Sequence, residues 1–581
     1  MKAQGNNSLK DCRQYKKNKI KKEVTFMKKK WLSRLVATML SGIMATGMLT
    51  GCGEQQEVGS ANTETQIVES VATATETEVA ETELTYPVDT DVELRMYCLG
   101  LKPSSAYVDA SESPFHTGLS ERTGIKVNWE YPVEGADNNS SYNLMLQEEE
   151  LPHIIYSGKA NVAHATQLLA DGLIYDLTDY IPKYAPDYWE YINRPENAES
   201  LKALKTESGQ LYSIAAMRES EYNITYLGPV IRQDWLNECG LEKPVTLEDW
   251  EKVLVAFKDK YNATLGFPLG RFNTGGGFAS GTDAHAALTL NWYVDEDGKV
   301  QCANSQEEWK EFLEVFHRWY DMGLIDPDFA TAGDSDVRAK ALNGEIGAAF
   351  TAMSQLTNFI TDATAENTGA EWVGVSYART APGEPTKYIY TDRQLYSMGF
   401  GAMISTSCSE EELIAALQFL NYGYTEEGIM YWNYGTEGET YTVDANGEVQ
   451  FTELVTADEQ GLGEALKKYT GTSGSGITVQ LAHFVQIKNN PVSAAAVYEW
   501  IDNTEAAAYV LPSLAYSDDD TLKYNDITSA MKTYVAEMAL KFVTGDESLD
   551  NFDKFVEELN EYGMAEVLEI MQGGYESYLE R

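Results

Sequence analysis

The sequence has few cysteines and few basic residues for its length, and each shortage excludes a class of protein. Six cysteines occur among 581 residues, and none of them forms a Cys-x-x-Cys pair. Neither a disulfide framework nor a zinc site is indicated, because both are built from cysteines at short, repeated spacings. Cys98, Cys239, Cys302 and Cys408 lie far apart in apolar or helical contexts, which is typical of single thiols inside a fold.

Acidic residues outnumber basic ones over most of the chain. The first 51 residues hold 12 of the 44 Lys and Arg residues and 2 of the 90 Asp and Glu residues, so the remainder has a net charge of −56. We expect no nucleic-acid partner, because contacts to phosphates need a basic surface. The same charge disfavours acidic sugars and anionic lipid head groups, and it favours a soluble monomer.

The sequence also lacks the common catalytic motifs. It contains no His-Glu-x-x-His, no Gly-x-Ser-x-Gly and no phosphate-binding loop, and its six histidines are scattered. Residues 295–299 are rich in oxygen ligands but are too short for a calcium loop, so an Asp-Gly hairpin turn is favoured. We expect no catalytic residue, metal or cofactor, although the two carboxylates of a glycoside hydrolase would not stand out among so many acidic residues.

Residues 27–52 have the pattern of a lipoprotein export signal. Three lysines and Arg34 precede an apolar run of about 15 residues, which ends at Leu49-Thr50-Gly51-Cys52. A basic start, an apolar middle and small residues before a cleavage site form a secretory signal peptide, and the run is shorter than the ~20 residues that span a bilayer. The cysteine makes the site similar to a bacterial lipobox, which implies that Cys52 carries a lipid and anchors the chain to the outer face of the membrane.

The segments on either side of this signal have no pattern of a folded domain. Residues 1–26 are polar and basic, and we expect them to be a mis-assigned extension, with Met27 as the initiator. Residues 53–85 are rich in Glu, Thr and Ala, so a disordered acidic linker is predicted over 52–87. The ~495 residues that remain exceed one hydrophobic core, and two or more lobes are expected.

Strand and helix patterns alternate at the start of the folded part. An alternating strand over 92–97 precedes a helix over 114–123, which stops at Gly124, and a second strand follows over 125–129. This order predicts an α/β fold with a parallel sheet. Three pairs of residues have the spacing of a capping box, which predicts that a helix begins at each. These pairs are Thr246 with Asp249, Ser305 with Glu308, and Ser409 with Glu412.

Aromatic residues are the most distinctive content, with 36 tyrosines and 11 tryptophans. Most must lie in a core, as in any large α/β domain. Residues 291–293, 394–396 and 431–435 place aromatic rings in loop-like contexts that are harder to bury. Flat rings beside a few polar groups suit the apolar faces of sugars. For any one of these rings, core packing and ligand contact are equally open alternatives.

Seven short strings, in order along the chain, carry a family resemblance. Through them the chain resembles the bacterial extracellular solute-binding proteins of ABC transporters, family 1, and is closest to the long, carbohydrate-binding lipoproteins of the LipO/YtcQ-like group. One departure is His153, where the family usually has aspartate. The strings are LPHIIY (151–156), DGLIYDL (171–177), IRQDWL (231–236), WYDMGLIDPDF (319–329), GEIGA (344–348), YGTEGETYTV (434–443) and KFVTGDESLDNFDKF (541–555).

The resemblance implies a periplasmic-binding-protein-like fold, in which two α/β lobes are joined by crossing hinge strands and a ligand cleft lies between them. It places the N-lobe in residues 88–225 and 398–430, and the C-lobe in residues 226–397 and 431–581. In such sheets ligands bind beyond the carboxyl ends of the strands.

The resemblance also implies the parts that individual residues play. Tyr97, Ser157 and Gly158 are expected on the rim of one lobe, and the other candidates on the hinge and the second lobe. Of these, Arg232 and Ser157 would hydrogen-bond sugar hydroxyls, or Arg232 would instead be a structural ion-pair partner. The aromatic candidates of the second group are Trp292, Trp432 and Tyr434, which would stack on sugar rings, and Tyr396.

The function implied is capture of an oligosaccharide by lobe closure and its delivery to a two-subunit ABC permease with an ATPase, without catalysis. Two alternatives stay open, a lipid-anchored glycoside hydrolase or lyase, and a ligand sensor with the same cleft. Peptide or amino-acid ligands stay open as well. Adjacent permease genes would favour import, an adjacent histidine kinase gene would favour sensing, and cleavage of a glycan would identify an enzyme.

Overall fold

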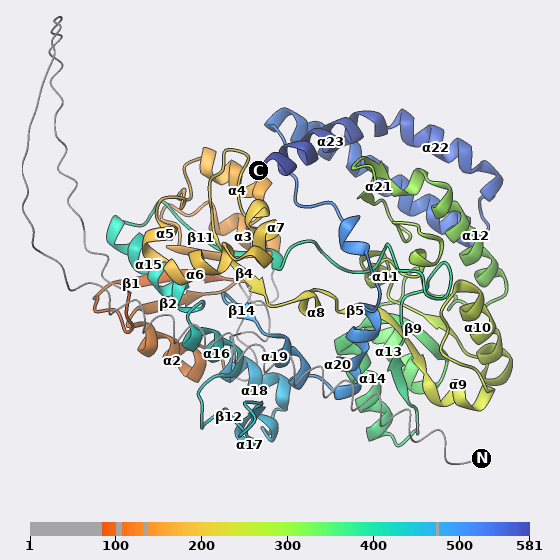
Figure 1. Cartoon of the computed structure of the whole chain (residues 1–581), viewed down its shortest axis with the longest axis horizontal. Helices are drawn as coiled ribbons and strands as arrows, with labels where there is room; N and C mark the ends of the chain where they lie inside the picture. Colours follow the sequence, from red (N-terminus) through yellow and green to blue (C-terminus); the bar gives the residue numbers. More distant parts are fainter. Residues whose placement is uncertain (1–83, 100–106, 133–136, 472–475) are drawn as a thin grey trace, which may run out of the picture. The chain divides into compact units, whose positions relative to one another are not determined.

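The computed structural model describes residues 84–99, 107–132, 137–471 and 476–581 (Figure 1). The predicted extension over 1–26, the signal peptide over 27–51, Cys52 and nearly all of the linker lie outside the described residues. Within the described part of the chain, no helix is both long and apolar enough to cross a membrane. Of the four cysteines in this part, Cys98, Cys302 and Cys408 are buried and Cys239 is half-buried.

The first lobe is built on a six-stranded sheet with the strand order β14-β4-β11-β3-β1-β2. β1 pairs in parallel with β2 and β3, and β14 in parallel with β4, but β11 runs antiparallel to both β3 and β4. The parallel pairing expected for the first strands is confirmed. β11 differs because it arrives from the second sheet rather than through a crossover helix. The strands are β1 (Glu93–Cys98), β2 (Lys126–Glu130), β3 (Ile154–Ser157), β4 (Ile214–Arg218), β11 (Tyr396–Ile404) and β14 (Val479–Gln480).

The second lobe is built on a four-stranded sheet with the order β10-β5-β9-β6. Every residue of β5 (Leu227–Arg232) and β9 (Ile346–Ala352) is buried, since helices cover the sheet on both faces. β6 (Thr264–Gly266) and β10 (Trp372–Gly374) form the two edges. The covering helices are α10 (Leu247–Tyr261), α11 (Leu269–Gly275), α13 (Asp334–Asn343), α14 (Met353–Ala365) and α20 (Pro491–Trp500).

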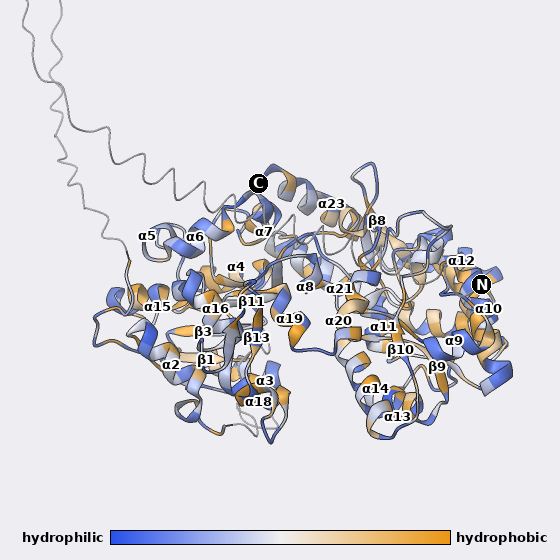
Figure 2. Ribbon diagram, turned by 60° about the horizontal axis from the view of Figure 1, so that its bottom comes forward, coloured by the Kyte–Doolittle hydropathy of each residue, from blue (hydrophilic) through white to orange (hydrophobic). Residues whose placement is uncertain are grey.

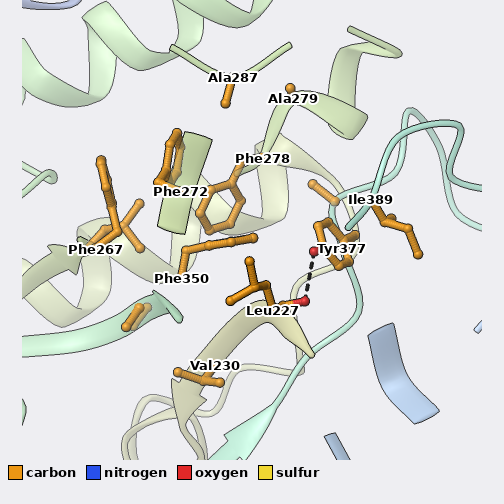
Figure 3. Close-up of a cluster of buried hydrophobic side chains, with 14 of the residues drawn as sticks. Leu227, Val230, Phe267, Phe272, Phe278, Ala279, Ala287, Phe350, Tyr377 and Ile389 are labelled. Atoms are coloured by element: carbon orange, nitrogen blue, oxygen red, sulfur yellow. Dashed lines mark hydrogen bonds between the residues drawn. The ribbon is translucent and has the colours of Figure 1, made fainter. Parts of the chain in front are cut away.

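Aromatic side chains fill the core of the second lobe. Phe272, Phe278 and Phe350 meet above β5, and Tyr377 donates a hydrogen bond to the carbonyl oxygen of Leu227 at 2.9 Å (Figure 3). Each fully buried ring of this kind stabilises the fold by about 1.5–3 kcal/mol. The first lobe also has a hydrophobic interior, since β1 and β3 are largely hydrophobic when the chain is coloured by hydropathy (Figure 2).

Two of the three predicted capping boxes are confirmed. Thr246 and Asp249 exchange hydrogen bonds of 3.2 and 3.3 Å at the start of α10, and Ser409 and Glu412 do the same at the start of α15 (Glu410–Tyr422). The third is wrong, because α12 (Glu307–Asp321) starts after Gln306. The Ser305 hydroxyl is used elsewhere and donates to the carbonyl oxygen of Cys302 at 2.9 Å.

The predicted hairpin is confirmed at β7 (Trp292–Val294) and β8 (Val300–Cys302), which pair antiparallel. The carboxylate of Asp295 accepts the backbone N–H groups of Asp297 and Lys299 at 3.0 and 2.9 Å. Gly298 has φ +75°, a conformation that glycine adopts without strain. The carboxylate of Asp295 therefore closes the turn through these two hydrogen bonds.

Three segments cross between the two sheets. Residues 219–226 join β4 to β5 through α8 (Glu221–Ile224), residues 375–395 join β10 to β11, and residues 481–490 lead from β14 through α19 (Ala482–Ile487) to α20. Backbone hydrogen bonds tie them together where they leave the first sheet, as at Arg218 N–H to Leu395 O, 2.7 Å. Because β14 pairs with β4, the first sheet includes residues 479–480, which the sequence had assigned to the C-lobe with the rest of 431–581.

The C-terminal helices contact both lobes. α21 (Asp518–Thr544) packs on α12 of the second lobe, and α22 (Phe552–Glu561) follows it. α23 (Met564–Glu580) packs on β8, and its Tyr578 hydroxyl donates to the carboxylate of Glu199 in α7 (Ala198–Ala203) at 2.9 Å. The end of the chain thus connects the hairpin to the first lobe.

Candidate ligand-binding site

A cavity of about 570 Å³ lies between the hairpin, the crossing segment 375–395 and the chain that leads into α21. Ala163 of α4 (Val162–Ala170) adds a contact from the first lobe, so both lobes contribute to the wall. The volume is in the range of small-molecule sites, which are usually aromatic with a few polar groups. Seven aromatic side chains line it: Trp292, Tyr293, Tyr388, Tyr390, Tyr509, Tyr516 and Tyr524.

The hairpin supplies a stacked aromatic wall. The imidazole of His285 lies parallel to the ring of Tyr293, with centroids 4.0 Å apart, and the ring of Tyr509 lies 5.0 Å away. Burial lowers the pKa of His285 to about 4, and the positive charge of Lys387 acts in the same direction. His285 is therefore neutral at physiological pH, and this wall is uncharged.

The charge of Lys387, which also lines the cavity, is already compensated. Its ammonium group lies 3.6 Å from a carboxylate oxygen of Asp283 and 3.3 Å from one of Glu296. Glu296 also accepts the hydroxyl of Tyr509 at 3.0 Å. The remaining polar lining consists of neutral amides and hydroxyls, and the described residues that line the cavity include no Asp or Glu.

A pair of tyrosines joins the cavity to the hinge. Tyr390 lines the cavity, and its hydroxyl donates to the hydroxyl of Tyr226 at 2.7 Å. Their rings meet edge to face with centroids 4.6 Å apart, and Tyr226 remains 42% exposed. Since these residues belong to two crossing segments, the pair couples the wall of the cavity to the chain that connects the lobes.

Of the predicted ligand-binding residues, Trp292 lines this cavity, and it is half-buried. Ser157 and Gly158 lie on the first lobe at the carboxyl end of β3. The Ser157 hydroxyl accepts the backbone N–H of Lys159 at 3.2 Å, and the ring of Phe400 covers Gly158. A part in ligand binding stays a prediction for all three residues.

Four of the predicted aromatic residues are buried in the core instead. Tyr97, Tyr396, Trp432 and Tyr434 are only 4%, 3%, 2% and 1% exposed, so their rings offer no face to a ligand in this structure. In the segment 431–435, expected to be loop-like, residues 431–434 form the last turn of α16 (Glu426–Tyr434), and Gly435 is its C-cap. Its rings point into packed cores, with Trp432 on Phe115 and Tyr434 near Phe484.

Arg232 forms a structural ion pair, which is the second of the two roles expected for it. Its guanidinium forms two hydrogen bonds with the carboxylate of Asp234, at 2.8 and 2.5 Å, and lies 4.0 Å from the ring centroid of Trp235. It ends β5, whereas the hinge joins β5 at its other end, beside Leu227. The side chain is therefore held within the second lobe and does not line the cavity.

Most of the aromatic lining was not identified from the sequence. Tyr388 and Tyr390 come from the crossing segment, and Tyr509, Tyr516 and Tyr524 from the chain around the start of α21. No periodic signal marks these residues in the sequence, because residues 387–390 form no helix or strand and all four of them line the cavity.

Comparison with known proteins gives consistent matches. The family model described as "Bacterial extracellular solute-binding protein" matches residues 105–430. Lipoprotein LipO of Bacillus subtilis is 24% identical over 432 residues, covering 71% of this chain and 74% of LipO. The fructooligosaccharide ABC transporter substrate-binding protein FusA of Streptococcus pneumoniae is 23% identical, covering 81% of this chain and 88% of FusA.

A solved structure shows the same fold. The S. pneumoniae FusA structure in complex with kestose superposes on this chain with a TM-score of 0.63 at 19% identity. The match covers 84% of this chain and 100% of the FusA chain. At this identity the likeness is one of fold alone.

Proposed function

The chain belongs to the bacterial extracellular solute-binding protein family, and from that premise we propose that it captures an oligosaccharide for an ABC permease. The observation that carries the proposal is the cavity lined by seven aromatic rings and mostly neutral polar groups. Aromatic faces bind the apolar faces of sugar rings, while amides and hydroxyls bind their hydroxyl groups. That the relative FusA is named for fructooligosaccharides supports a sugar as the ligand.

Capture takes place by a shift between open and closed arrangements of the lobes. A ligand that contacts both lobes binds the closed arrangement more tightly and so increases its population. The crossing segments absorb the motion, and the Tyr226–Tyr390 pair lies where they reach the cavity. The permease then distinguishes the loaded protein by its closed state, and no bond in the ligand is broken.

The proposed location is the outer face of the cell membrane. The lipobox pattern ending at Cys52 supports a lipid anchor there, as does the match to a relative that is named a lipoprotein. A linker of ~33 residues would then hold the folded part roughly 30 Å from the membrane on average. That distance keeps a closing cavity within reach of a permease in the same membrane.

A glycoside hydrolase is the alternative of a different class. It would need two carboxylates on either side of the scissile bond, and no Asp or Glu is found among the described residues that line the cavity. This observation favours binding without cleavage. Incubation with a glycan followed by mass spectrometry separates the two, because only an enzyme changes the mass of the glycan.

A thermal-shift screen of residues 53–581 against neutral and acidic oligosaccharides and short peptides tests the proposal. A ligand at 100 times its dissociation constant should stabilise the protein by about 2.7 kcal/mol. A saturable shift with a sugar that is recovered intact supports the proposal. A shift with peptides alone would refute the carbohydrate assignment, and cleavage of the sugar would refute the absence of catalysis.

A further inference from the structure

The side chain of His285 keeps a buried polar atom without a partner in the wall of the candidate cavity. It lines the cavity and is 6% exposed. Neither of its ring nitrogens forms a hydrogen bond with another described residue, and Nδ1 is closed off from solvent. Among the described residues that line the cavity, His285 is the only one with a buried polar atom in this state. Buried polar groups nearly always have a partner, so the partner of this ring must come from a molecule in the cavity.

The imidazole of His285 is held in place by three aromatic neighbours. Tyr293 stacks on it with the ring planes 8° apart, and the ring centroids of Tyr509 and Tyr388 lie 5.0 and 5.8 Å away. The backbone is fixed as well, since the side-chain amide of Asn291 donates to the carbonyl oxygen of His285 at 2.5 Å. The ring therefore has its orientation before a ligand arrives, which lowers the entropic cost of binding.

The ring nitrogen that a ligand can reach is Nε2, because Nε2 keeps accessible surface and Nδ1 does not. Burial and the nearby charge of Lys387 lower the pKa of His285 to about 4, so the ring carries a single proton. In a neutral imidazole one nitrogen donates and the other accepts. Buried N–H groups without an acceptor are rare, so the proton belongs on Nε2. The cavity wall thus contains a fixed, uncharged hydrogen-bond donor.

The cavity offers no uncompensated charge to a ligand. Lys387 is the only charged side chain among the described residues that line it, and its ammonium group pairs with the carboxylates of Asp283 and Glu296. An anionic sugar would meet two carboxylates beside one ammonium group, and a cationic sugar would meet no carboxylate in the described lining. Because an unpaired charge is costly to bury, the lining favours an uncharged ligand.

A sugar on the aromatic wall would bring its hydroxyl groups to this donor. Tyr293, Tyr388 and Tyr509 line the cavity together with the ring that they surround. Hydroxyl groups project from the rim of a sugar ring, so a sugar that rests on these side chains has a hydroxyl group within reach of the imidazole. A hydroxyl oxygen accepts a hydrogen bond without carrying a charge, which fits both the donor and the uncharged lining.

We propose that His285 selects the ligand by donating a hydrogen bond from Nε2 to a hydroxyl oxygen of an uncharged oligosaccharide. This inference rests on the proposed function and narrows it to neutral sugars. A sugar that lacks this hydroxyl group, or holds it in the opposite configuration, would leave the N–H unpaired beneath the ligand. Sites of this kind discriminate strongly against such analogues. His285 therefore reads one position of the sugar, whereas the aromatic rings bind the face of many sugars.

Isothermal titration calorimetry of residues 53–581 with a panel of trisaccharides tests the charge of the ligand. The neutral probes are kestose, maltotriose, mannotriose and xylotriose, and the acidic probes are trigalacturonate and trimannuronate. The tightest-binding probe should be neutral and should bind at least tenfold more tightly than either acidic one. An acidic probe that binds as tightly as the best neutral probe would refute the inference. If no probe binds, the proposed function itself fails.

Monodeoxy derivatives of the tightest-binding neutral probe locate the hydrogen bond. With the wild type, removal of one particular hydroxyl group should weaken binding about tenfold. His285→Phe keeps a ring that can stack on Tyr293 but has no N–H. This variant should bind the parent sugar about tenfold more weakly than the wild type does and should not distinguish it from that derivative. A merely structural role for His285 would lower both affinities and leave their ratio unchanged.

Matched substitutions complete the test. His285→Gln, whose amide N–H can lie near the position of Nε2, should keep most of the discrimination. His285→Met has a similar shape without a donor and should lose it, and it serves in place of His285→Phe if that variant does not fold. His317→Phe removes an imidazole from α12, outside the cavity, and should leave both affinities unchanged. Discrimination that survives the loss of the N–H at position 285 would refute the inference and leave the sugar-binding function standing.

Discussion

Replacing Lys488 with methionine should stabilise the protein in the absence of ligand. In the folded state burial and Arg218 lower the pKa of this lysine from 10.5 to about 8. A difference of one pKa unit corresponds to about 1.4 kcal/mol, so the charged form costs the folded state on the order of 3 kcal/mol. Methionine is unbranched and apolar, and it can pack over the ring of Phe484 without that cost.

The gain in stability from Lys488→Met should depend on pH. Because the pKa is lower in the folded state, the unfolded chain holds the proton more tightly, and stability rises with pH between about 8 and 10.5. Below pH 8 both states are protonated and the full cost applies. Above pH 10.5 both are neutral and the cost vanishes. The advantage of Lys488→Met should therefore be largest at pH 7 and should disappear near pH 10.5.

Chemical denaturation of residues 53–581 at pH 7, 9 and 10.5 measures the effect. Comparison at each pH cancels the titration of the many tyrosines, which wild type and variant share. Lys532→Met, on the exposed surface of α21, should change the free energy of unfolding by less than about 0.5 kcal/mol. A Lys488→Met variant that is no more stable than wild type at pH 7, or whose advantage does not shrink with pH, would show that the cation is already compensated.

Three further predictions follow from other parts of the molecule. Trp292→Ala should weaken oligosaccharide binding about tenfold in calorimetry, since a stacked ring is worth roughly 1.4 kcal/mol, and unchanged affinity would place the ligand elsewhere. Thr246→Ala should lower the free energy of unfolding by about 1 kcal/mol, whereas Ser305→Ala, which caps no helix, should cost less; equal losses in denaturation would contradict the assignment of the caps. Cys52→Ala should release the protein from the membrane fraction and abolish uptake while binding in vitro is unchanged, and retention at the membrane would disprove the lipid anchor.

The fold was predictable where a local signal decides the local structure. The hydroxyls of Thr246 and Ser409 accept the backbone N–H groups of Asp249 and Glu412, as the spacing predicts. Ser305 has the same spacing, but a short turn ahead of α12 takes its hydroxyl. The hairpin at Asp295 followed from an Asp-Gly turn between two strands. The direction of β11 could not be read in this way, because it depends on which sheet the preceding segment leaves.

The aromatic residues show why burial is hard to infer from sequence. The segment 431–435 looked like a loop because it ends in glycine and mixes polar with aromatic residues. The cap that starts its helix is Thr425, which accepts the N–H of Gly428 at 2.9 Å and lies several residues upstream. The rings of Trp432 and Tyr434 then face two separate cores. Only tertiary packing decides between a core ring and a ligand-binding ring.

The candidate site was predictable in kind but not in most of its residues. Trp292 was selected because residues 291–293 place aromatic rings in a loop-like context that is harder to bury. The tyrosines at 388, 390 and 509 come from irregular segments that have no periodicity to indicate a shared surface.

Equilibrium titration of residues 53–581 and of the Trp292→Ala variant with the same oligosaccharide tests the central claim most directly. The account predicts saturable binding of one glycan per chain by the wild type, a loss of about tenfold in the variant, and recovery of the glycan with its mass unchanged. Equal affinity of the two proteins, cleavage of the glycan, or binding of peptides in place of every sugar would contradict it.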